Sequence, residues 1–168
     1  MSDPASDPAS DQVSDQDSAA APPEGFSRIA AGSGFIAVNG PLYLRQGDGA
    51  PLFGFRVEAR HCNPMGICHG GWMASFCDML LPLSALRLVP EIGRRFLPTI
   101  SLQLDYLAPS PLGAWVQGEA QVLRHTRSMV FAQGLVTADS VPVARCSGIL
   151  KIGAVYAGPQ PLPSTDAG

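Results

Sequence analysis

A glycine-rich loop that runs into a long apolar segment constrains the fold of this 168-residue chain more than any other stretch. Residues 61–78 read HCNPMGICHGGWMASFCD, with turn-forming residues filling the first half. From about Gly70 to Val89 nearly every residue is apolar, which predicts one long helix that is buried on all sides. The first N–H groups of a helix have no partner within it and attract negative charge. The helix start near Gly70 is therefore a candidate site for an oxyanion.

One acid and one proline interrupt this predicted helix. Asp78 is the only acidic residue between Gly70 and Val89. A buried carboxylate is costly unless it is paired or functional, and desolvation makes it a stronger base. Pro82 cannot donate to the carbonyl four residues back, which belongs to Asp78. We expect Pro82 to kink the helix after Asp78 and so to shape a pocket. The alternative is that Pro82 lies near a fraying helix end and is simply tolerated there.

Short alternating segments surround the helix and predict strands. Residues 26–31 are expected to form a short helical turn. Three segments are expected to be extended strands, residues 34–40, 41–46 and 51–60. A hairpin turn is expected between the last two, at Gly47–Gly49. Four longer strands are predicted after a basic loop at 91–95: residues 99–106, 114–124, 128–138 and 141–152. One buried helix and a run of antiparallel strands indicate an α+β domain in which the sheet wraps around the helix.

Composition sets the boundaries of that domain. Residues 1–25 repeat SDPAS and carry six acids and no base, which is typical of a disordered tail. A single domain is expected over 26–155, followed by a flexible Gly-, Pro- and Ser-rich tail over 156–168. The net charge of the whole chain is −3. Without the acidic tail the chain is only weakly basic, which argues against nucleic-acid binding.

The four cysteines are scattered rather than spaced as a disulfide framework, and we expect reduced thiols in the cytoplasm. No charged-then-apolar leader and no apolar run of about 18 residues is present, so we expect neither export nor a membrane span. The pairs His61-Cys62 and Cys68-His69 contain zinc-ligand residue types, but their spacing lacks the usual close geometry. We therefore expect no metal, and we interpret four residues as structural: Cys62, Cys77, His61 and His125.

The loop and the strand after the helix together carry a family pattern. The run Asn63-x-x-Gly66-x-x-His69-Gly70-Gly71 is followed by an acid at 78, and a strand opens with Thr99 and closes in Asp105-Tyr106-Leu107-Ala108-Pro109 before Leu112-Gly113. Over about residues 52–152 this pattern resembles the hotdog-fold acyl-CoA thioesterases. It is most similar to the branch that contains the phenylacetate-pathway (PaaI-like) enzymes.

The resemblance implies a role for each matching residue. Gly70 would supply the oxyanion-hole N–H, and Asp78 would act as general base or nucleophile. Asn63 and His69 would orient the thioester carbonyl and the water, and Thr99 of the opposite subunit would hold that water. The residues expected at the acyl pocket or the dimer contact are Gly71, Trp72, Met73 and Phe76. The CoA phosphates are expected at Arg127, with Arg94, Arg95 and Arg124 as further candidates.

Each of these residues also has an ordinary structural interpretation. The glycines could serve close helix packing, Asn63 and His69 could only order the turn, and a strand threonine such as Thr99 needs no special explanation. The resemblance further implies a homodimer or homotetramer with shared sites, and no cofactor beyond the coenzyme A of the substrate.

We thus expect an acyl-CoA or aryl-acyl-CoA thioesterase. One alternative is a non-catalytic acyl-CoA-binding sensor, although binding alone needs no buried acid. The other is a hotdog hydratase or dehydratase, which would normally carry an Asp and His pair in a different loop.

Overall fold

The computed structural model describes residues 21–30, 34–155 and 158. The predicted C-terminal tail lies outside the described residues except for Gly158, and so does the predicted N-terminal tail up to residue 20. Residues 21–25 are described, and the carbonyl of Ala21 accepts a hydrogen bond of 2.8 Å from the guanidinium of Arg56. The part of the chain that is fastened to the domain therefore begins earlier than residue 26.

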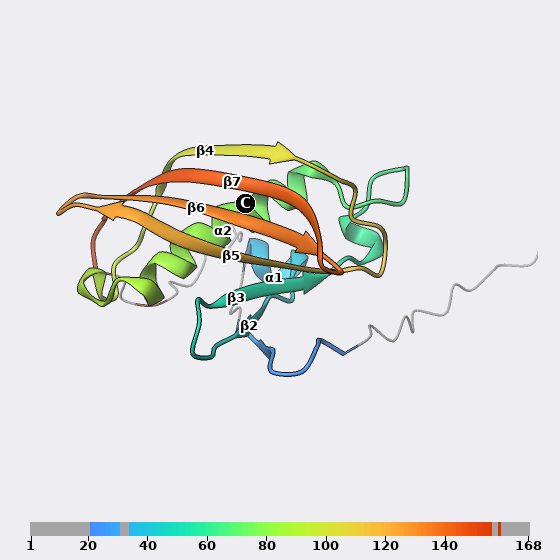
Figure 1. The fold of residues 1–168 in the computed structure, drawn as a ribbon, viewed down its shortest axis with the longest axis horizontal. Helices are drawn as coiled ribbons and strands as arrows, with labels where there is room; N and C mark the ends of the chain where they lie inside the picture. The colour runs from blue at the N-terminus through green and yellow to red at the C-terminus, as the bar shows by residue number, and fades with distance from the viewer. Residues whose placement is uncertain (1–20, 31–33, 156–157, 159–168) are drawn as a thin grey trace, which may run out of the picture.

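Seven antiparallel strands form one sheet in the order β1-β2-β3-β5-β6-β7-β4 (Figure 1). The strands are β1 (Ser27–Arg28), β2 (Tyr43–Arg45), β3 (Leu52–Arg56), β4 (Thr99–Tyr106), β5 (Trp115–His125), β6 (Met129–Ala138) and β7 (Val141–Lys151). The four long strands are confirmed almost residue by residue, because alternation over eight or more positions defines a strand well. The hairpin at Gly47–Gly49 is also confirmed, since β2 and β3 pair with each other.

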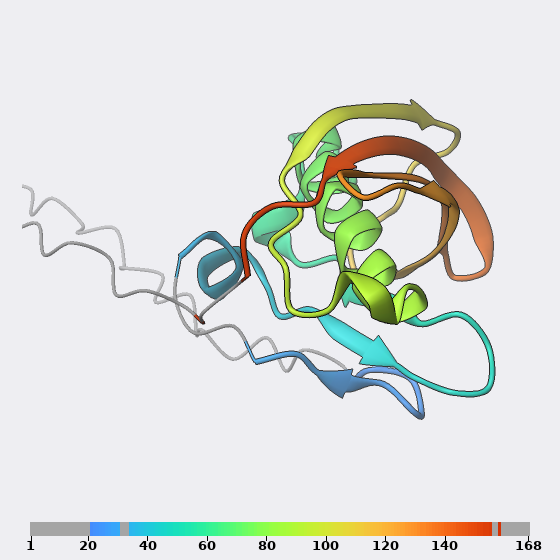
Figure 2. The same cartoon turned by 90° about the vertical axis from the view of Figure 1, so that its left-hand side faces the viewer.

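One long helix, α2 (Gly70–Leu88), lies against the concave side of this sheet, which curves around it (Figure 2). The predicted helix is confirmed, and it continues as α-helix through Pro82. The core is formed mainly between α2 and strands β3, β5, β6 and β7. Its largest fully buried side chains are Phe53, Phe55, Phe76, Leu80, Leu81 and Leu150.

The prediction that α2 is buried on all sides is wrong for the single chain. Eight of its residues are buried, whereas Gly71 and Asp78 are exposed, and half-buried apolar residues such as Met79 and Leu83 lie between these two classes. The reason is geometric, since one curved sheet covers only one side of a helix. One face of α2, which holds Asp78 and half-buried apolar residues such as Met79 and Leu83, is therefore only partly covered by its own chain.

Two predictions in the N-terminal part are wrong. Residues 34–40 are not a strand but contain the short helix α1 (Phe35–Asn39), and residues 27–28 form strand β1 instead of a helical turn. An apolar run of six or seven residues does not distinguish helix from strand by its period. β1 is defined by its pairing with β2 rather than by its own sequence, with Ile29 N–H donating to Leu42 O at 2.8 Å.

The third predicted strand ends early. β3 stops at Arg56, and a 3₁₀ turn, η1 (Ala59–His61), leads into the glycine-rich loop. A second 3₁₀ turn, η2 (Pro90–Ile92), follows α2. In the part of the chain that the structure describes, no helix is long and apolar enough to cross a membrane.

Candidate active site

The glycine-rich loop is a closed hairpin that ends at the first residue of α2. Across its base, His69 N–H donates to His61 O at 2.7 Å and Asn63 N–H donates to Ile67 O at 2.9 Å. Its tip is a turn in which Asn63 O accepts from Gly66 N–H and Asn63 Oδ1 accepts from Met65 N–H, both at 2.9 Å. Gly66 has a φ of +72°, which favours glycine at that position. The side-chain oxygen of Asn63 thus orders the turn.

The hairpin rests on the connection between β4 and β5. Cys68 N–H donates to Ser110 O at 2.8 Å, and Leu112 N–H donates to Gly66 O at 3.1 Å. These bonds join the two parts of the family pattern, the glycine-rich loop and the Pro109–Gly113 turn, that the sequence separates by about 40 residues. The loop therefore has a fixed position on the sheet.

His69 caps α2 and leaves one N–H free at the helix start. It occupies the N-cap position, and its Nδ1 accepts from Gly71 N–H at 2.9 Å. Its carbonyl accepts from Trp72 N–H and Met73 N–H at 2.9 and 3.1 Å. Among the described residues, the N–H of Gly70 has no acceptor. Because Nδ1 of His69 accepts, the proton of the neutral ring is on Nε2, which is a second available donor.

Tyr106 contacts the same helix start and was not predicted as a site residue. Its hydroxyl donates to Gly70 O at 2.8 Å, and a Cβ added at Gly70 would lie 3.3 Å from this hydroxyl. Tyr106 is 57% exposed, and the partial desolvation where it meets α2 raises its pKa, with smaller contributions from Cys77 and Cys68. The tyrosine belongs to the strand-closing part of the family pattern, but the sequence does not show that it reaches Gly70.

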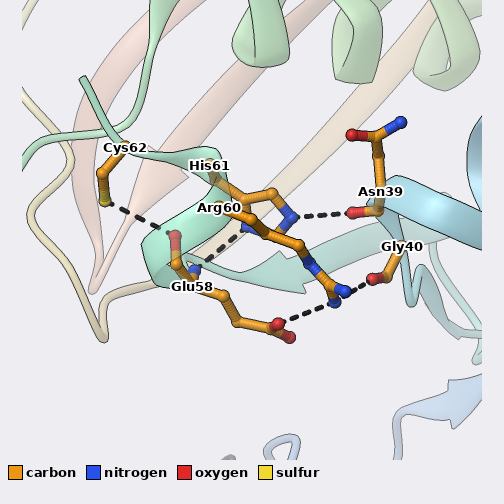
Figure 3. Close-up of polar contacts among 6 residues, drawn as sticks. All are labelled: Asn39, Gly40, Glu58, Arg60, His61 and Cys62. Carbon is orange, nitrogen blue, oxygen red and sulfur yellow. Dashed lines mark hydrogen bonds and ion pairs between the residues drawn. The ribbon is translucent and has the colours of Figure 1, made fainter. Parts of the chain in front are cut away.

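His61 fastens the hairpin to the N-terminal segment, as Figure 3 shows. The side chain is 2% exposed, its Nδ1 accepts from Glu58 N–H at 3.0 Å, and its Nε2 donates to Asn39 O at 2.7 Å. Beside it, Arg60 pairs with Glu58 at 2.6 Å and donates to Gly40 O. Burial lowers the pKa of His61, which agrees with a neutral ring that both accepts and donates. The structural interpretation of His61 is confirmed.

The aromatic residues at the start of α2 lie in the core. Trp72 is 7% exposed and stacks on His61 with ring centroids 4.7 Å apart, and Met73 and Phe76 are buried. Their side chains fill the interior of the single chain. The structure therefore does not support the prediction that Trp72, Met73 and Phe76 line an acyl pocket or a dimer contact. Gly71, in contrast, lies at the surface beside Gly70.

Asp78 and Thr99 lie away from the helix start. Asp78 is exposed on the partly covered face of α2, eight residues or about 12 Å along the axis from Gly70. The expectation that the helix buries this carboxylate is wrong in the single chain. Thr99 begins β4, whereas Tyr106 at the other end contacts Gly70, so Thr99 is about 23 Å from that contact. One chain does not bring Thr99 together with Gly70.

The predicted phosphate-binding arginines are exposed at one end of the strands and after α2. Arg127 lies in the β5–β6 turn, where Thr126 Oγ1 accepts from Met129 N–H at 3.0 Å. A cleft of about 420 Å³ after α2 is lined by Leu86, Arg87, Gly93, Arg94 and Arg95. A larger cleft of about 630 Å³ lies over β4 to β7 and does not include the hairpin. Within the described ranges, no three His, Cys, Asp or Glu side chains lie together as metal ligands.

A curved antiparallel sheet around one long helix is the arrangement of a hotdog domain. Comparison with known proteins supports this class. Residues 65–144 match the family model of the Thioesterase superfamily. The match agrees with the predicted resemblance to the thioesterases and, with the solved structures below, confirms the predicted hotdog fold.

The similar proteins agree with this assignment. The Pseudomonas aeruginosa protein named Putative esterase PA0474 is 27% identical over 133 residues, which cover 77% of this chain and 96% of that protein.

Three solved structures share the fold. Zebrafish thioesterase superfamily member 2 has a TM-score of 0.63 at 21% identity, covering 71% of this chain and 87% of that one. A point mutant of the phenylacetic acid degradation protein PaaI from Thermus thermophilus has a TM-score of 0.56 at 23% identity, covering 69% and 96%. A Streptococcus pneumoniae thioesterase protein solved with coenzyme A has a TM-score of 0.56 at 17% identity, covering 66% and 84%.

Proposed function

We propose that this protein hydrolyses an acyl-CoA or aryl-acyl-CoA thioester to the free acid and CoA. The observation that carries the proposal is the unpaired N–H of Gly70 at the start of α2, beside the Nε2–H of His69. Hydrolysis places negative charge on the carbonyl oxygen of the thioester, and one oriented donor there lowers the barrier by about 2.7–4 kcal/mol. The Streptococcus pneumoniae neighbour that holds coenzyme A supports the CoA moiety of the substrate.

The proposed reaction uses water as the nucleophile. Asp78 of one copy accepts a proton from the water as the water oxygen attacks the carbonyl carbon, and Gly70 N–H of the other copy holds the oxyanion that forms, because the two residues lie about 12 Å apart along α2 of one chain. The tetrahedral intermediate then collapses, the carbon–sulfur bond breaks, and the CoA thiolate takes up a proton. Asn63 and His69 orient the carbonyl and the water, Gly71 allows close approach of the acyl group, and Arg127 meets the CoA phosphates.

The proposed site is shared between two copies of the chain. Two observations support this. Thr99 lies at the far end of β4 from Tyr106, a strand length of about 23 Å, and the face of α2 that holds Asp78 is only partly covered. A second copy packed on that face would bury Asp78, and desolvation would make its carboxylate a stronger base. We therefore propose a homodimer, or a tetramer of two such dimers, as the active form.

The direct test is release of CoA thiol from acetyl-, hexanoyl-, palmitoyl-, benzoyl- and phenylacetyl-CoA. We expect hydrolysis of at least one ester by the wild type and a loss of about a hundredfold or more in Asp78→Asn, which is about 2.7 kcal/mol of transition-state stabilisation. Asp48→Asn is a matched control, because this acid lies exposed in the β2–β3 turn.

Two outcomes would contradict the proposal in different ways. Saturable binding of the esters without hydrolysis would identify a binding protein. Hydrolysis that survives in Asp78→Asn would keep the activity and remove Asp78 as the base.

A further inference from the structure

Cys62 and Cys68 lie opposite each other at the base of the glycine-rich hairpin. They form an antiparallel bridge, flanked by the His69 N–H to His61 O and the Asn63 N–H to Ile67 O hydrogen bonds. Since the bonds flank the pair, the two cysteines are a non-hydrogen-bonded pair. In such a pair the Cα atoms are about 4.5 Å apart and the side chains lie on the same side. That separation is within the range of about 4.4–6.8 Å over which a disulfide forms.

The two thiols are accessible and close to one another. Both are free and half-buried, whereas Cys77 and Cys146 are fully buried. Burial raises the pKa of Cys68 to about 12, and the second cause is the neighbouring Cys62. Each sulfur contacts a main-chain carbonyl: Cys62 Sγ lies 3.5 Å from Glu58 O, and Cys68 Sγ lies 3.8 Å from His69 O. Neither contact is strong enough to hold the two sulfurs apart, because a thiol is a weak donor.

We propose that Cys62 and Cys68 are a reversible dithiol–disulfide pair that locks the base of this hairpin. The disulfide would close a seven-residue segment whose ends carry the two hydrogen bonds of Asn63 and His69. Oxidation therefore restrains the segment that holds two candidate site residues. This site is independent of whether the protein hydrolyses a thioester.

The oxidant is a low-molecular-weight disulfide such as glutathione disulfide. The thiolate of Cys62 attacks one sulfur of glutathione disulfide, which forms a mixed disulfide and releases one glutathione thiolate. The thiol of Cys68 loses its proton to solvent and attacks the Cys62 sulfur, which forms the protein disulfide and expels the second glutathione. Two protein thiols are oxidised, and one glutathione disulfide is reduced to two glutathiones. Cys62 attacks first because burial keeps Cys68 protonated.

The test is made on the folded full-length protein incubated with glutathione disulfide, then denatured and labelled with N-ethylmaleimide. Of the four cysteines, only Cys77 and Cys146 should take the label. Before labelling, the oxidised protein should be about 2 Da lighter than the reduced protein, because two hydrogens are lost. Tryptic residues 61–87 contain three of the cysteines and locate the bond within one peptide. Dithiothreitol should restore four labelled cysteines. Cys62→Ala and Cys68→Ala should not form any intramolecular disulfide.

Hydrogen exchange tests the locking. The amides of Asn63 and His69 should exchange at least about tenfold more slowly in the oxidised protein than in the reduced one. Four labelled cysteines after oxidation, a bond to Cys77 or Cys146, or only a glutathione adduct would overturn the pairing. Equal exchange rates in the two states would overturn the lock. Neither readout depends on thioesterase activity, so its outcome is separate from that of the proposed function.

Discussion

Replacing Gly70 by proline deletes the candidate oxyanion donor with little change to the fold. Gly70 is the first residue of α2, where proline fits because its missing N–H is not needed by the helix. Proline also restricts the preceding residue to extended backbone, and His69 already has φ −64° and ψ 134°. We expect the free energy of unfolding to change by less than about 1 kcal/mol.

The expected loss is catalytic. Removal of one oxyanion donor lowers kcat by about 10²–10³, or about 2.7–4 kcal/mol. Gly70→Ala is the matched control, since it keeps the N–H and adds a Cβ 3.3 Å from the hydroxyl of Tyr106, an exposed side chain that can yield. Alanine should retain kcat within about fivefold of the wild type, because changes at exposed contacts cost about 0.5 kcal/mol.

The assay is steady-state hydrolysis of the best CoA ester from the panel, with CoA thiol as the readout, alongside thermal melts of both variants. The reasoning is refuted if Gly70→Pro, folded and as stable as Gly70→Ala, keeps a kcat within about tenfold of that control. Such a result would show that another donor holds the oxyanion.

Three further predictions concern stability. His69→Ala removes the cap of α2 and should cost about 1 kcal/mol in chemical denaturation, whereas His69→Asn, which can cap, should cost less; equal costs would contradict the capping role. Because burial lowers the pKa of His61, the unfolded chain takes up its proton first, so stability should be complete above about pH 6.5 and fall below it. In His61→Gln the denaturation midpoint should change less between about pH 7 and 5 than in the wild type, and an equal pH dependence in the two proteins would count against His61 as the cause. Gly54→Ala places a Cβ 2.8 Å from Val116 O and should cost about 1–3 kcal/mol, while Gly47→Ala, with nothing within 4 Å, should melt like the wild type.

Long periodic segments could be predicted from the sequence, and short ones could not. The helix from Gly70 and the strands after residue 99 carry enough turns or alternations to define their own period. α1 and β1 span five and two residues, and their conformations depend on partners elsewhere in the chain.

The same distinction holds for the candidate site. The free N–H of Gly70 follows from local rules about helix starts, and it was predicted. The contact of Tyr106 with Gly70 joins residues 36 positions apart, which no local pattern reveals. The exposure of Asp78 was misjudged because composition shows that a helix is apolar but not which of its faces the sheet covers.

The hydrogen bond between Tyr106 and Gly70 has a consequence for how the fold transmits force. β4 is the last strand in the sheet order, so its outer edge has no neighbouring strand among the described residues. Tyr106 stands at the end of that strand, and its hydroxyl is tied to the first peptide of α2 at 2.8 Å. A load applied to the open edge of the sheet is therefore transmitted directly to the first peptide of the helix through the Tyr106 side chain.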